Sequence, residues 1–108
     1  MANPWAGEVE LVIDGEPRRL RLTLGALAEL EDNLGAGSLV ELVERFETGK
    51  PSTRDVLSLI VAGLRGGGWS GTARDLLASE IEGGPLAAAR VAGLLLVRAF
   101  ALPSDVAG

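Results

Sequence analysis

The spacing of apolar residues along the chain changes at Leu24. Over residues 20–24 leucines alternate with arginine or threonine, which is the period of two that a half-buried strand shows. Over residues 24–34 leucines recur every three or four positions, which is the period of an amphipathic helix. The pattern therefore predicts a strand that runs directly into a helix.

The residues before this point predict a β-hairpin. Asp14-Gly15 is a preferred central pair for a two-residue type I′ turn, because both positions need positive φ. A loop of this length places Glu10 opposite Arg19, so that opposite charges face each other across the strands. The same register places Pro17 where its missing N–H would point outward, which predicts a sheet edge on that side.

Helical periods separated by glycine, serine and proline predict about five helices after the hairpin. Thr23 is placed to cap the first helix and Gly35 to end it, while Ser38 and Glu41 form a capping box for the second. The predicted fold is α+β, mainly α: a two-stranded antiparallel β-hairpin at about 8–13 and 17–23, then helices at about 24–34, 38–48, 53–65, 71–82 and 85–101. A length of 108 residues predicts a single domain, 1–108, with short flexible ends at about 1–6 and 103–108.

The last predicted helix is apolar on nearly every side. One interpretation makes it the core helix of the domain, wrapped by the others. The other makes part of it a groove, together with a tryptophan, for an amphipathic partner helix. Under the second interpretation the partner-binding residues are Trp69, Val91, Leu94, Leu95, Arg98 and Phe100.

Composition narrows the chemistry that the chain can perform. There is no cysteine and no histidine, so thiolate nucleophiles, imidazole bases and the usual ligands of zinc are missing. The 15 acidic residues outnumber the 10 basic ones, and a net charge of −5 argues against a general phosphate-binding surface. Carboxylates, hydroxyls and amines remain for chemistry, but no active site is visible, and we expect no catalytic residue, no cofactor, no metal and no nucleic-acid partner. The alternative of a small enzyme or nucleotide-binding module would use the glycine loop at 66–71.

Three local clusters have a chemical and a structural interpretation. The glycine run at 66–71 lacks the Lys-Ser/Thr of a Walker A loop, which favours an inter-helix connection with Trp69 packed as a plug over a nucleotide site. The acidic residues within 29–32 are interpreted as a solvated helix face rather than an acid/base pair. The arginines within 18–21 are interpreted as a salt-bridged sheet face rather than a nucleic-acid patch.

Neither the start of the chain nor its apolar runs predict membrane insertion. The first ten residues lack the basic and apolar segments of a secretion signal. The longest uninterrupted apolar run, 91–97, is far short of the ~20 residues that span a bilayer. We expect a cytoplasmic protein with no membrane partner.

Four stretches carry a family resemblance. They are G-E-V-E-L-V-I-D-G at 7–15, L-R-L-T-L-G-A-L-A-E-L-E at 20–31, D-V-L-S-L-I-V-A-G-L-R-G-G-G at 55–68, and the G-G-P at 83–85 ahead of the apolar last helix. In these stretches the chain resembles the small tail assembly chaperones of gene transfer agents and related tailed prophages.

The resemblance implies a non-enzymatic chaperone that binds the tape measure protein and keeps it soluble while a phage-like tail assembles. It further implies the tail tube protein as a second partner, a cytoplasmic location in the bacterial host, and absence from the mature particle; a homo-oligomer is left open. The alternative is a structural tail component, a tube or connector subunit whose hairpins would pair edge to edge around a ring. We rank it second because a tube protein is expected to carry several long strands.

Overall fold

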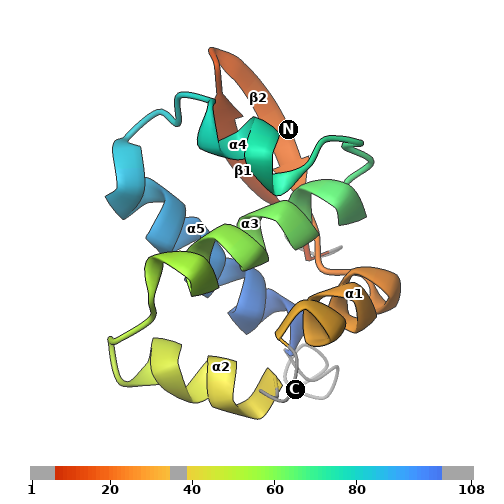
Figure 1. Cartoon of the computed structure of the whole chain (residues 1–108), viewed down its shortest axis with the longest axis vertical. Coiled ribbons are helices and arrows are strands. Elements are labelled where there is room, and N and C mark those ends of the chain that lie inside the picture. Colours follow the sequence, from red (N-terminus) through yellow and green to blue (C-terminus); the bar gives the residue numbers. More distant parts are fainter. Residues whose placement is uncertain (1–6, 35–38, 101–108) are drawn as a thin grey trace, which may run out of the picture.

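A computed structural model describes residues 7–34 and 39–100 of the chain (Figure 1). The elements follow one another as β1 (Val9–Ile13), β2 (Glu16–Leu20), α1 (Leu24–Leu34), α2 (Leu39–Glu47), α3 (Thr53–Gly66), α4 (Ala73–Leu77) and α5 (Gly84–Ala99). The predicted fold class, a hairpin followed by five helices, is confirmed. The predicted flexible ends, the cap at Ser38 and the terminator at Gly35 lie outside the described residues.

The hairpin has the predicted turn and register. Asp14 and Gly15 have φ of 52° and 78°, as a type I′ turn requires, and Glu10 pairs with Arg19. The second strand ends at Leu20, three residues earlier than predicted. The reason is that the N–H of Arg21 turns to α3 and donates to the carbonyl of Gly63 at 2.9 Å.

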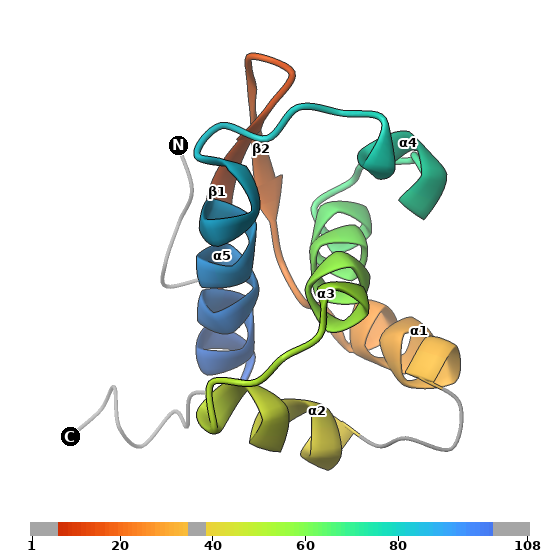
Figure 2. The same ribbon diagram turned by 60° about the vertical axis from the view of Figure 1, so that its left-hand side comes forward.

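Helix α3 is the centre of the molecule. It packs against α1, α4, α5 and β2, and β1 packs against α5. In the view of Figure 2, β2 is therefore seen between the two longest helices, α5 and α3. Leu59 and Leu64 of α3, Leu20 of β2 and Leu95 of α5 are completely buried together. Through these side chains the end of β2, just before α1, packs against α3 and against α5, the last helix.

The glycine run at the end of α3 has a packing role. A Cβ on Gly66 would lie 1.9 Å from the carbonyl oxygen of Arg21, and a Cβ on Gly67 would lie 2.1 Å from that of Arg19. No other residue type fits so close to a neighbouring backbone. The glycines therefore let the end of α3 lie directly on the outer edge of β2.

The fourth helix is shorter than the predicted 71–82, covering Ala73–Leu77. Thr72 and Asp75 begin it with a capping box. The chain then leaves the helix because residues 80–82 pair with the outer edge of β1: Ile81 bridges Ile13, and Asp14 donates its N–H to the carbonyl of Glu80 at 2.8 Å. Sequence periodicity does not reveal this pairing, because its partner lies almost seventy residues away.

Candidate functional site

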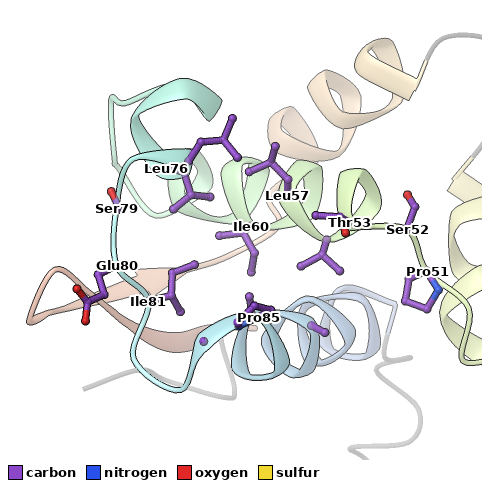
Figure 3. A pocket seen from close by; sticks show the side chains of 15 residues that line it. Pro51, Ser52, Thr53, Leu57, Ile60, Leu76, Ser79, Glu80, Ile81 and Pro85 are labelled. Carbon is purple, nitrogen blue, oxygen red and sulfur yellow. The ribbon is translucent and has the colours of Figure 1, made fainter.

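Helix α5 is flanked by two open apolar grooves, one along its N-terminal half and one along its C-terminal half. The first, which we call the α3–α5 groove, has a volume of about 560 Å³. Figure 3 shows Leu57 and Ile60 of α3, Leu76 of α4, and Ile81 and Pro85 pointing toward this groove from its different sides. Pro85 occupies the first turn of α5, where a missing N–H costs nothing.

The second groove, which we call the α2–α5 groove, has a volume of about 850 Å³ and lies between α2 and the C-terminal half of α5. Its wall on α2 includes Val40, 67% exposed, and Phe46. Gly93 lies on the α5 side, where a Cβ would approach the ring of Phe46 to 3.9 Å. The lining is mainly apolar, with three charged residues: Glu44, Glu47 and Arg90.

An ion pair holds α2 in position beside these grooves. Asp55, in the first turn of α3, is 4% exposed and receives two hydrogen bonds from the guanidinium of Arg45 on α2, at 2.7 and 2.9 Å. It also accepts the backbone N–H of Ser52 at 2.9 Å, which closes a capping box. The hydrogen bonds from Arg45 hold the pKa of Asp55 below its usual value against the opposing effect of burial.

The six residues predicted to bind a partner lie in three environments: the α2–α5 groove, the buried core, and contacts with other parts of the chain. Leu94 and Phe100 line the α2–α5 groove and are 39% and 48% exposed. Val91 and Leu95 are buried in the core at 8% and 0% exposure. Binding of a partner by any of them stays a prediction.

The other two predicted residues make contacts within the chain. The guanidinium of Arg98 donates a hydrogen bond to the carbonyl of Glu8. Trp69 is half-buried against the core, and its ring lies over Gly71, where a Cβ would come within 2.1 Å of it. The position of Trp69 agrees with the interpretation of this ring as a plug.

Sequence reasoning missed the contribution of α2 to the groove. Within the apolar stripe of this helix, Leu42 is completely buried. Val40 lies beside that stripe and is exposed, and the face of α2 that carries Val40 and Phe46 opens toward α5. An apolar residue that does not fit the buried stripe of its helix is the signal that identifies this wall.

The polar clusters have structural roles. Glu29 of α1 pairs with Arg65 of α3 at 2.7 Å, while Glu31 and Asp32 are exposed, which confirms a solvated helix face. Within residues 7–34 and 39–100 no three acidic side chains are grouped so that they could hold a metal ion. In the same ranges no helix combines the length and apolar character needed to cross a bilayer.

The fold and its grooves define a small α+β protein that exposes apolar surface on both halves of its last helix. A family model described as "Phage tail tube protein, GTA-gp10" matches residues 6–102. The chain therefore belongs to this family of phage tail tube proteins. Searches of curated proteins and of solved structures gave no match.

This membership confirms the relation to gene transfer agents and phage tails and corrects two expectations. The chaperone function is wrong, because the family that matches is one of tail tube proteins. The expected absence from the mature particle is wrong for the same reason, since a tail tube is part of that particle. One hairpin and five helices do not exclude a tube subunit, because a fold does not by itself determine function.

Proposed function

We propose that this chain is a structural subunit of a phage-like tail, which assembles with further copies of itself into the tail tube. The observation that carries the proposal is the match of the tail tube family over residues 6–102. The role requires binding between subunits and no chemical step, and we propose accordingly that the protein is not an enzyme. Contact with a tape measure protein stays a prediction.

Exposed apolar side chains on the helices support association between copies. Leu77 of α4, Leu86 and Val97 of α5 and Val40 of α2 are all between 67% and 70% exposed. Large apolar side chains gathered beside grooves are typical of surfaces that bind another protein. The α3–α5 and α2–α5 grooves offer the concave part of such contacts.

The hairpin is a poor candidate for edge-to-edge pairing around a ring. The outer edge of β2 is covered by Gly66 and Gly67, and Pro17 offers no N–H there. On the outer edge of β1 the carbonyl of Val12 accepts the N–H of Glu82 at 3.0 Å. We therefore propose that copies associate through helical surfaces rather than by extending the sheet.

The test is the protein content of purified particles. Tails are separated from heads after mild disruption, and the chain is quantified in the tail fraction by mass spectrometry against a labelled standard. A tube subunit is expected in many copies per tail, and deletion of its gene is expected to remove the tube. Absence of the chain from purified tails would overturn the proposal.

A further inference from the structure

Helix α5 presents a continuous exposed stripe on the side opposite its buried face. Leu86, Arg90, Leu94 and Val97 follow one another at intervals of three or four residues, so they share one side of the helix. Leu86 and Val97 are 68% and 67% exposed, Leu94 is 39% exposed, and Arg90 is also exposed. The stripe runs from the first turn of the helix into the α2–α5 groove.

The charged residues of this surface have no partner within the chain as described. Arg90 lies in the middle of the stripe, and Glu44 and Glu47 lie on the α2 wall of the groove. Over residues 7–34 and 39–100, the salt bridges and side-chain hydrogen bonds involve other groups. The groove thus carries an unpaired positive charge on one helix and two unpaired negative charges on the other.

We infer that the α5 stripe and the α2–α5 groove form a self-complementary surface on which two copies of the free chain pair about a two-fold axis, with their α5 helices antiparallel. Leu86 of each copy then lies opposite Val97 of the other and fills the open end of its groove. Arg90 of each copy lies over Gly93 of the other, where the missing side chain leaves room for it. There it reaches Glu44 and Glu47.

Charge and area both favour a second copy as the occupant. The antiparallel arrangement brings one guanidinium, that of Arg90, to the two carboxylates of the partner's groove, and it does so twice, once in each copy. Stable interfaces bury roughly 1,200 Å² or more in total, and the two-fold arrangement doubles the area that one contact of Leu86 and Arg90 with a groove contributes. The reciprocal arrangement joins both halves of both helices into one interface, as an isologous contact requires.

The pairing concerns the chain before it enters a tail and does not rest on the tail role. It leaves the α3–α5 groove, with Leu77 beside it, outside the interface. In a paired chain the exposed apolar stripe of α5 is covered, which would limit non-specific association of an unassembled subunit.

The test is the molar mass of the purified full chain by sedimentation equilibrium. The wild type is expected at twice the mass of one chain, and Arg90→Glu at the mass of one chain. Combining Arg90→Glu with Glu44→Arg and Glu47→Arg exchanges the charges and is expected to restore the dimer. Arg54→Glu, the same reversal on an exposed arginine outside the groove, is the matched control and is expected to remain dimeric.

A cross-link tests the antiparallel register independently of affinity. The chain has no cysteine, so Leu86→Cys combined with Val97→Cys introduces the only thiols. Mild oxidation is expected to give a covalent dimer, whereas a cysteine pair at Arg54 and Val97 is expected to give none. A monomeric wild type, assemblies larger than two chains, or a dimer that survives Arg90→Glu would each overturn the inference.

Discussion

Arg45 of α2 and Asp55 of α3 form a bidentate salt bridge, in which the guanidinium donates hydrogen bonds of 2.7 and 2.9 Å to the two carboxylate oxygens. The same carboxylate caps α3 through the N–H of Ser52. One buried side chain therefore begins the central helix and holds α2 beside it. Because α2 forms a wall of the α2–α5 groove, the shape of that groove depends on this pair.

Replacing Asp55 by alanine removes both functions at once. We expect Asp55→Ala to lower the free energy of unfolding by about 2 kcal/mol, combining the loss of a capping box with that of an ion pair whose carboxylate is buried and whose guanidinium is partly exposed. Arg45→Ala should also destabilise the protein, because it leaves the buried carboxylate of Asp55 without its charged partner. Urea unfolding at neutral pH measures both. The neighbouring exposed Arg54→Ala is the control, and equal losses for all three variants would contradict a specific role of the pair.

The same pair predicts how stability depends on pH. Hydrogen bonds from Arg45 lower the pKa of Asp55 in the folded chain, so below about pH 4 the unfolded chain binds a proton more readily than the folded one. The contribution of Asp55 is therefore fully present above that pH and is lost as pH falls through the lowered pKa. In thermal melts from pH 7 to pH 2, the difference in Tm between the wild type and Asp55→Asn should shrink below pH 4. A constant difference would be inconsistent with this linkage.

The parts of the fold that could be predicted are those determined by neighbouring residues. Asp14-Gly15 specifies the turn and register of the hairpin, and α1 begins and ends at the residues that its leucine period indicates. The fourth helix was predicted too long because Ile81 pairs with Ile13, an interaction between distant segments. Local periodicity contains no information about such a partner.

The candidate site was predicted only in part, for the same physical reason. The apolar surface of α5 is evident from the sequence, and Leu94 and Phe100 do line a groove. Which face of α5 is buried depends on where α3 and the hairpin pack. Leu95 differs from Leu94 by one position and is completely buried. The one local sign of this difference is that Leu94 lies four residues from both Arg90 and Arg98, on the charged side of the helix.

The close approach of α3 to β2 predicts a severe effect of a single methyl group. A Cβ on Gly67 would lie 2.1 Å from the carbonyl oxygen of Arg19, so one of the two backbones must shift to admit it. We expect Gly67→Ala to destabilise the protein by about 2 kcal/mol or more, as overpacking does.

Gly25→Ala is the matched control for this prediction. In α1 the nearest atom to an added Cβ is the hydroxyl oxygen of Thr23 at 3.9 Å, so there is room for the methyl group. Alanine should stabilise this helix by about 0.5 kcal/mol, since it restricts the unfolded chain. Opposite shifts of the urea midpoint are expected for the two variants, and a neutral Gly67→Ala would show that α3 does not lie directly on β2.

Substituting Leu95 tests whether this position of α5 belongs to the core or to a binding surface. Its side chain is completely buried, and its Cδ1 lies only 2.8 Å from where a Cβ on Gly63 would be. Leu95→Ala is therefore expected to cost about 3 kcal/mol, the typical loss for a buried leucine. Leu24→Ala makes the same substitution at a side chain that is 84% exposed, and should change stability by less than about 0.5 kcal/mol. Circular dichroism during urea titration measures both variants. A Leu95→Ala protein as stable as the wild type would mean that another face of α5 packs on α3 and the hairpin. The exposed stripe would then lie on a different side of the helix.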